Sequence, residues 1–213
     1  MTELEDLSTL LSDVGSTYGM QVTCDDQAQA QKLAETLSRL PHALIAACGI
    51  KELGFKDLGV SREYFPNHGL YVDDKLFLNT QNIDDPIVHK DGSGRTLDRF
   101  EHTLYHELGH GLDKMRDNES QRDPWLSLSG WSKEPFPGGL KVIISEEGCE
   151  DVHGTWFYDS KASFPRFYAK QAPWEDYADC FAFYVGGLKD FLPAAKIKFL
   201  DGILSPYYAP TGT

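Results

Sequence analysis

The chain has 213 residues, of which 41 % are apolar and 25 % charged, as in ordinary folded proteins. Its formal net charge of −13 argues against nucleic-acid binding as the main function, because an acidic surface repels the phosphate backbone. The acidic N-terminus and the lack of an 18-residue apolar run predict neither a secretory signal nor a membrane span, so we expect a cytoplasmic protein, or one exported by a signal-less route.

The four cysteines, at positions 24, 48, 149 and 180, form no CxxC pair. This spacing gives no support to a cysteine zinc site or a thioredoxin-type motif. In a chain of this length, scattered cysteines are more often reduced core residues than a disulfide framework. We therefore expect free thiols.

Helices and strands alternate in the first third of the chain. A capping box that begins at Thr2 predicts a first helix, and Gly15 predicts its end. Alternating apolar residues over 18–24 predict a strand. A second helix follows, with an aspartate at 25 or 26 as its cap and Pro41 as an interruption.

The middle of the chain combines a hairpin with the clearest helix. Residues 70–72 and 76–78 read as two strands around a turn, and 82–95 read as a loop. The spacing predicts a helix over 96–115, capped by Thr96, with one apolar face. That face consists of Leu97, Phe100, Leu104, Leu108, Leu112 and Met115.

The last part of the chain is expected to be largely helical. Residues 117–139 read mostly as loop, and 140–145 and 155–158 are candidate strands. Pro173 opens a helix, because proline is favoured in the first helical turn. A final helix is expected over 190–200.

An HExxH motif lies inside the predicted helix 96–115. His106 and His110 are four residues apart, about 6 Å along one helix face, so both imidazoles can bind one ion. Glu107 points about 100° away around the helix, which suits it to a metal-bound water rather than to the metal. His102 shares the histidine face but lies another turn back, and we interpret it as a bystander.

Gly109 is an unusual residue for the interior of this helix. Glycine costs about 1 kcal/mol there relative to alanine. Close approach of another backbone or of substrate would explain it, although simple tolerance would do so equally well.

A catalytic zinc site needs a third protein ligand, and here it must come from elsewhere in the chain. A histidine ten residues after the first would mark one class of zincins, but that position is Arg116. The predicted helix at 173 carries Glu175 and Asp179 on one face. Glu175 would bind the ion, and Asp179 would accept a hydrogen bond from a ligand histidine. The helix dipole alone also favours acids at this position, and Asp176 and Asp179 remain alternative ligands.

Two segments resemble the signatures of a known family. Residues 106–113 read HELGHGLD, and residues 168–184 read YAKQAPWEDYADCFAFY. They resemble the lethal-factor-like zincin peptidases, the group of anthrax lethal factor and the Pro-Pro endopeptidases. Asp179 departs from the pattern, because the family usually has the longer glutamate at that position. Asp113 matches the family pattern, but the sequence gives it no physical role beyond a polar residue at the helix end.

The resemblance implies a zinc-dependent endopeptidase that holds one Zn²⁺ per chain and acts on a protein or peptide substrate. Glu107 would take a proton from the attacking water, and a tyrosine seven residues before the glutamate ligand would stabilise the oxyanion. The implied residues are His106, His110 and Glu175 as ligands, Glu107 as general base and Tyr168 as oxyanion partner.

The resemblance also implies an α+β, two-lobed zincin-like fold. Residues 1–213 would form a single catalytic domain with a lobe boundary near 115–120. The N-terminal lobe would hold a sheet and the HExxH helix, and the C-terminal, mostly helical lobe would supply Glu175. An extended substrate would pair with an edge strand, for which we expect residues 76–79. Residues 140–158 would form an added hairpin or flap.

Two other functions remain open. The chain could be a binding module that keeps zinc for structure only, although such a site needs neither Glu107 as a base nor Tyr168. It could also be a zinc hydrolase of a non-protein amide or a cell-wall peptide, which the sequence cannot distinguish from a peptidase. Nothing in the sequence indicates the oligomeric state.

Overall fold

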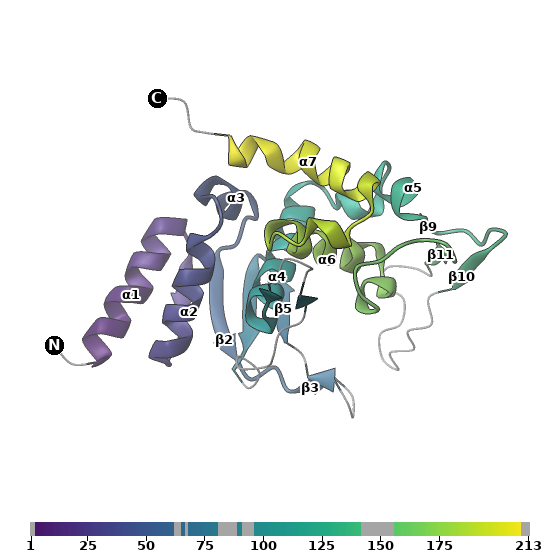
Figure 1. The fold of residues 1–213 in the computed structure, drawn as a ribbon. Helices are drawn as coiled ribbons and strands as arrows, with labels where there is room; N and C mark the ends of the chain where they lie inside the picture. The colour runs from purple at the N-terminus through teal and green to yellow at the C-terminus, as the bar shows by residue number, and fades with distance from the viewer. Residues whose placement is uncertain are drawn as a thin grey trace.

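The computed structural model describes residues 3–61, 65–66, 68–80, 89–90, 96–141 and 156–209. Its mixture of helices and small sheets agrees with the α+β class that the sequence predicts (Figure 1). Among the described helices, none combines the length and the apolar character that crossing a membrane requires.

The strands form one main sheet and three smaller ones. They are β1 (Gln21–Thr23), β2 (Glu52–Lys56), β3 (Val60–Ser61), β4 (Phe65–Pro66), β5 (Gly69–Val72), β6 (Lys75–Asn79), β7 (His89–Lys90), β8 (Thr96–Leu97), β9 (Trp131–Ser132), β10 (Gly139–Lys141) and β11 (Phe157–Asp159). The main sheet has the order β1-β2-β6-β5, with β5 antiparallel to β6 and the other pairs parallel. A second, antiparallel sheet has the order β10-β11-β9.

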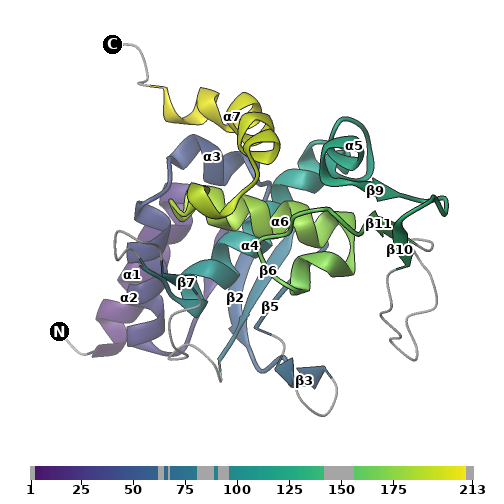
Figure 2. The ribbon, with the colours of Figure 1, turned by 45° about the vertical axis from the view of Figure 1, so that its right-hand side comes forward.

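Helices surround the main sheet. They are α1 (Glu3–Tyr18), α2 (Gln27–Ser38), α3 (His42–Ala47), α4 (Arg99–Met115), α5 (Trp125–Ser129), α6 (Pro173–Val185) and α7 (Ala194–Tyr208), with the short 3-10 helices η1 (Glu119–Gln121), η2 (Tyr168–Gln171) and η3 (Lys189–Phe191). Helix α4 packs against β5 and β6 and also against α6, at the centre of both views (Figures 1 and 2). Helix α1 packs against α2 and β1, and α1 and α2 lie side by side in Figure 1.

One cluster of buried apolar side chains extends through the molecule. It has members in the sheet and in the helices before and after it, including Leu33, Leu53, Leu108, Phe181 and Leu204. The cluster crosses positions 115–120, where the sequence suggests a lobe boundary. The division of the chain into two lobes remains a prediction.

In the N-terminal half, the predicted helix ends and the predicted hairpin can be compared with the structure. Helix α1 continues through Gly15 to Tyr18, so the predicted stop is wrong, whereas the start at Thr2 lies outside the described residues. Asp26 caps α2 as expected, by accepting a hydrogen bond from the Gln29 amide. The predicted hairpin is confirmed as β5 and β6.

The N-terminus of the HExxH helix differs from the prediction by three residues. Thr96 lies in the short strand β8, and the cap is Asp98. The Asp98 side chain accepts a hydrogen bond from the Glu101 amide at 2.7 Å, and the Glu101 side chain accepts one from the Asp98 amide. This reciprocal pair satisfies two free backbone donors, which a lone threonine cap would not do.

The C-terminal half contains more helix than the sequence indicates. Helix α5 and strand β9 lie inside 117–139, which we expected to be mostly loop. The last helix, α7, runs to Tyr208, beyond the predicted end at 200. The strands β10 and β11 pair as an antiparallel hairpin, and residues 142–155 between them lie outside the description.

The described cysteines are free thiols. Cys48 and Cys180 are buried and Cys24 is partly buried, while Cys149 lies outside the described residues. For these three, the expectation of reduced cysteines is consistent with the structure.

The predicted substrate edge is wrong. Residues 76–79 lie in β6, which is paired on both sides, with β2 and with β5. The strand at that edge of the sheet is β5, and its second side has no partner strand in the described part of the chain. The sequence pattern shows that both strands exist, but the pairing order is decided by the tertiary fold.

Gly109 lets α4 and α6 approach closely. A Cβ at this position would lie 2.9 Å from the Ala178 Cα and 3.3 Å from the Ala178 carbonyl oxygen. Those atoms are backbone, so no flexible side chain can move aside. Of the explanations for this glycine, approach of another backbone is the one that the structure supports.

Gly109→Ala is therefore expected to destabilise the protein. Overpacking costs about 1–3 kcal/mol, which outweighs the helix-propensity gain of about 1 kcal/mol. Chemical unfolding of the variant and the parent measures the loss of stability.

Gly202→Ala is a matched control, because Gly202 lies inside α7 and a Cβ there meets no atom within 4 Å. That variant should gain stability, by about 0.5–1 kcal/mol. If both variants gained stability equally, close packing of α4 on α6 would not explain Gly109.

Candidate metal centre

Helix α4 presents the two HExxH histidines to the N-terminal turn of α6. His106 Nε2 lies 3.0 Å from His110 Nε2 and 3.0 Å from Glu175 Oε2, and His110 Nε2 lies 3.4 Å from the same carboxylate oxygen. The three side chains are between 7 % and 16 % exposed. The structure thus brings together, from elements 69 residues apart in sequence, three donor atoms that could hold a metal ion.

The separations suit a small tetrahedral cation. Zinc bonds to nitrogen and oxygen of about 2.0–2.1 Å place tetrahedral ligand atoms about 3.3 Å from one another. The observed distances of 3.0, 3.0 and 3.4 Å lie close to that value. Two histidines and one glutamate are also a known ligand set of catalytic zinc sites.

The contacts of His106 show that the site attracts positive charge. Nδ1 lies 2.9 Å from Asp179 Oδ1, and it carries the proton because a carboxylate can only accept. The unprotonated Nε2 then faces Glu175 Oε2 at 3.0 Å. The lone pairs of this nitrogen and this oxygen repel each other unless positive charge lies between them. Although burial opposes a charged ring, Asp179 and Glu175 raise the pKa of His106 to about 10. A metal cation would relieve the same repulsion, so these residues are suited to bind a metal ion.

Glu175 is held in its charged form. Burial alone would favour the neutral acid, but His110 and His106 hold the pKa of the carboxyl far below its ordinary value. Its position in the first turn of α6 adds the favourable end of the helix dipole. An ionised carboxylate is the form that binds a metal.

Asp179 lies behind the histidines and is fully buried. It accepts the His106 Nδ1 proton, and the Arg166 guanidinium donates to both of its oxygens, at 3.0 and 2.6 Å. The shorter aspartate, in place of the glutamate usual in the resembling family, therefore reaches the histidine in this chain.

His102 is buried beside Asp179. It does not belong to the donor triad, which consists of His106, His110 and Glu175. Its Nε2 lies 3.2 Å from Asp179 Oδ1. Burial and the nearby Arg166 lower the pKa of His102 to about 3, so the ring is neutral. His102, His106 and Asp179 form a second group with metal-binding atoms, but the guanidinium on the same carboxylate disfavours a further cation.

Glu107 is buried beneath the edge strand β5. A Cβ on Gly69 would lie 2.6 Å from Glu107 Oε1, so only glycine lets the strand pass over this carboxylate. Burial raises the pKa of Glu107, while the two histidines and the Tyr71 amide act in the opposite direction. A carboxylate with a raised pKa is better matched to proton transfer near neutral pH.

Tyr168 lies in η2, immediately before α6, and packs against the site. The centroid of its ring is 5.7 Å from that of His106. The preceding Phe167 is 83 % exposed, so the two aromatic residues do not form a core pair. The charge on Glu175, followed by burial and Glu107, raises the pKa of the Tyr168 hydroxyl, which keeps it a hydrogen-bond donor.

Asp113, at the end of α4, has a structural contact that the sequence did not reveal. It is buried and accepts hydrogen bonds from the Ser120 amide at 2.7 Å and the Ser120 hydroxyl at 2.6 Å. These bonds fix η1 against the end of the HExxH helix.

Asp176, considered above as an alternative ligand, has other partners. Lys196 Nζ of α7 lies 2.6 and 2.7 Å from its two oxygens, and Trp131 Nε1 donates to it at 3.2 Å. Both members of the ion pair are buried. Asp176 thus joins α6 to α7 and β9, and its side chain does not belong to the donor triad.

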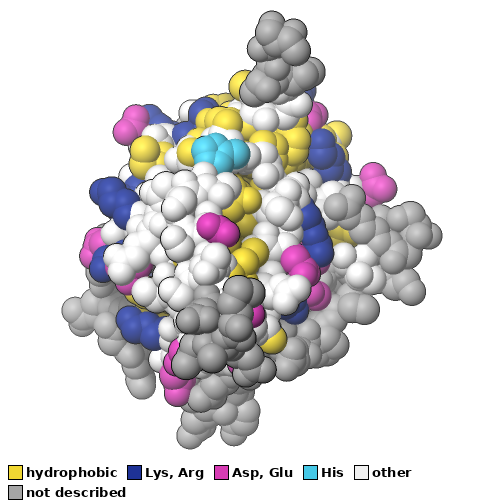
Figure 3. Space-filling view, turned by 90° about the vertical axis from the view of Figure 1, so that its left-hand side faces the viewer, with side chains coloured by type: hydrophobic (Ala, Val, Ile, Leu, Met, Phe, Trp, Pro, Cys, Tyr) yellow, Lys and Arg dark blue, Asp and Glu magenta, His cyan; other side chains and the backbone are white. Residues whose placement is uncertain are grey.

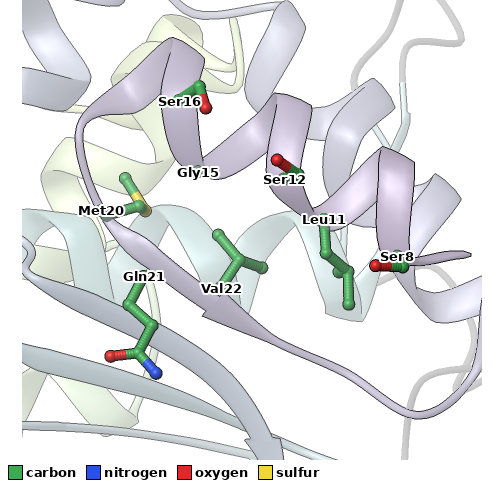
Figure 4. A pocket seen from close by; sticks show the side chains of 8 residues that line it. All are labelled: Ser8, Leu11, Ser12, Gly15, Ser16, Met20, Gln21 and Val22. Carbon is green, nitrogen blue, oxygen red and sulfur yellow. The ribbon is translucent and has the colours of Figure 1, made fainter.

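A pocket that is lined by none of these residues lies between α1 and β1 (Figure 4). Figure 3 shows the face that carries α1 and α2, where apolar side chains gather toward the top among scattered charges. Serine, glycine, glutamine and apolar residues line the pocket, so it offers neither a titratable group nor a strong metal ligand. The lining residues are Ser8, Leu11, Ser12, Gly15, Ser16, Met20, Gln21 and Val22.

No protein-family model matches the sequence, and no curated protein matches it either. The function therefore has to be inferred from the residues and their arrangement. Sequence reasoning missed Arg166 and Lys196, the cations that pair with the buried acids of α6. The available signal was indirect, because an acid on the buried side of a largely apolar helix needs a cationic partner.

Proposed function

We propose that this chain is a zinc-dependent metallopeptidase that hydrolyses peptide bonds, with His106, His110 and Glu175 as zinc ligands. The observation that carries the proposal is the convergence of three donor atoms at ligand-to-ligand spacing. A buried glutamate and a tyrosine that remains protonated lie beside them. The two-lobed zincin-like fold and the lethal-factor-like family belong to the same proposal, on the strength of the two sequence segments.

Bound zinc would lower the pKa of a coordinated water to about 7 and polarise the substrate carbonyl as a Lewis acid. Glu107 accepts the proton of the attacking water on its carboxylate and then delivers it to the leaving amine. Tyr168 donates its hydroxyl proton in a hydrogen bond to the carbonyl oxygen as negative charge develops there. Asp179 keeps His106 in the tautomer whose Nε2 can bind metal.

The substrate is proposed to bind as an extended strand along β5. This strand passes directly over Glu107 at Gly69, and its outward-facing Leu70 and Val72 are each 43 % exposed. An edge strand offers unpaired backbone groups to a peptide, and exposed alternate side chains add contacts. Peptide-bond hydrolysis is therefore favoured over hydrolysis of amides that lack an extended peptide backbone.

The ligand assignment predicts one zinc ion per chain and a strong effect of Glu175→Ala. Removing one of three protein ligands should weaken zinc binding by more than the roughly 10–100-fold that loss of an indirect contact costs. The measurement is a zinc titration against a competing chelator, together with metal content after gel filtration. Chelation of the parent should abolish peptide cleavage, and added zinc should restore it.

Glu35→Ala is the control, because Glu35 is exposed on α2, away from the site. It should bind zinc as the parent does. Equal zinc affinity for Glu175→Ala and Glu35→Ala would refute the assignment of Glu175. In a separate experiment, the peptides that the parent protein cleaves in a proteome digest would define the substrate class. They would also show any preference for proline beside the scissile bond.

A further inference from the structure

We infer that Arg166 is a positioning residue of the metal centre: its guanidinium fixes Asp179 behind His106 and at the same time supports the ring of Tyr168. The inference rests on the proposed function, since it concerns how that site is held in its working geometry. Neither the HExxH motif nor the helix that follows Pro173 contains this residue.

The first contact is a two-pronged salt bridge. Arg166 Nε lies 3.0 Å from Asp179 Oδ2, and Nη2 lies 2.6 Å from Oδ1. A planar guanidinium that donates to both oxygens fixes the orientation of a carboxylate as well as its charge. The rotation of the Asp179 carboxylate therefore depends on Arg166.

That orientation matters because Asp179 Oδ1 also accepts the proton of His106 Nδ1 at 2.9 Å. A carboxylate turned away from this direction would leave the imidazole free to change tautomer or rotate. Asp179 has a short side chain, so a small displacement of its carboxylate is enough to break the hydrogen bond to His106. Arg166 thus acts on His106 through Asp179 and not by direct contact with the metal.

The second contact is with Tyr168. The centre of the Arg166 guanidinium lies 5.7 Å from the centroid of the Tyr168 ring, within the range of a cation–π interaction. The same tyrosine ring also packs against the His106 ring, with 5.7 Å between their centroids. Tyr168 is 42 % exposed, and its ring has the guanidinium and the imidazole as packing partners.

The test uses Arg166→Lys, which keeps the charge next to the buried Asp179 and should therefore fold. A lysine cannot donate two parallel hydrogen bonds, so the orientation of the carboxylate is lost. We expect zinc affinity to fall by about 10–100-fold. At saturating zinc we expect kcat on a cleaved peptide to fall while KM stays within about twofold, because substrate contacts are unchanged.

Arg116→Lys is the matched control. Arg116 makes a similar two-pronged salt bridge with Glu119, at 2.6 and 3.1 Å, but has no contact with the metal centre. It should show parental zinc affinity and kcat. The melting temperature of both variants shows how much of each effect is loss of stability.

A double-variant comparison tests whether Arg166 affects zinc binding through Asp179. Arg166→Gln should weaken zinc binding in the parent but cause little further loss in an Asp179→Asn background. An equal loss in both backgrounds would overturn the inference, because Arg166 would then act independently of Asp179. The same conclusion would follow if Arg166→Lys lowered only the melting temperature and kept parental zinc affinity and kcat.

The outcome also separates this inference from the proposed function. A parent that neither binds zinc nor cleaves peptides would overturn both. A parent that binds zinc and cleaves peptides, beside an Arg166→Lys variant indistinguishable from it, would overturn the role of Arg166 alone.

Discussion

The Glu107→Gln variant is expected to bind zinc with the affinity of the parent and to lose about 10²–10⁴-fold in kcat. Glutamine has the shape of glutamate but cannot accept the proton of the attacking water. Glu107 does not belong to the donor triad, so metal binding should change little.

The burial of Glu107 makes this substitution informative. The side chain is only 6 % exposed and lies against Gly69 of the edge strand, so truncation to alanine would leave a cavity as well as remove the base. Glutamine keeps the packing and removes the charge alone. Because burial raises the pKa of this carboxyl, the neutral amide should not cost stability.

The measurement is kcat at saturating zinc, with zinc content and melting temperature recorded for the same samples. Glu35→Gln on the exposed face of α2 is the control and should behave as the parent. A fully active Glu107→Gln enzyme would refute the proposed mechanism. If neither parent nor variant cleaved any peptide while both bound zinc and the same partner, the chain would be a zinc-containing binding module.

Tyr168→Phe is expected to lower kcat by about 10²–10³-fold, the usual cost of a lost oxyanion donor. The change removes one hydroxyl and keeps the ring, which contacts His106 and Arg166. Tyr168 is 42 % exposed and is not part of the core, so stability should change little. Zinc binding should also be unchanged, since the hydroxyl is not among the donor atoms.

The readout is kcat on the best cleaved peptide, with Tyr18→Phe as the control. Tyr18 ends α1 and stacks on His42, away from the metal centre. A drop of less than about threefold for Tyr168→Phe would rule out an oxyanion role. A drop accompanied by a lower melting temperature would instead identify a packing residue, and the resemblance to the lethal-factor-like family would then depend on the two metal-binding helices alone.

The sequence by itself was enough to place the candidate metal ligands on two helices. The i, i+4 spacing of His106 and His110 is a property of the α-helix, and the apolar stripe of α4 shows which side is core. The proline at the start of α6 and the acids after it are also local signals. Such features involve neighbours within one or two turns, so the sequence reveals them.

The tertiary structure decided which distant residues meet. The edge position belongs to β5 and not to β6, because strand order depends on packing across the whole sheet. The distance between α4 and α6 depends on Gly109 facing the backbone of Ala178. No periodic pattern marks such a contact before both helices are in place.

The partners of the buried acids were likewise decided by the fold. Arg166 reaches Asp179 from a segment outside any helix, and Lys196 reaches Asp176 from α7. The sequence shows that charges lie in these segments but not which of them become buried together. A buried carboxylate is stable only with a matched cation, and the folded chain selects that cation through long-range packing.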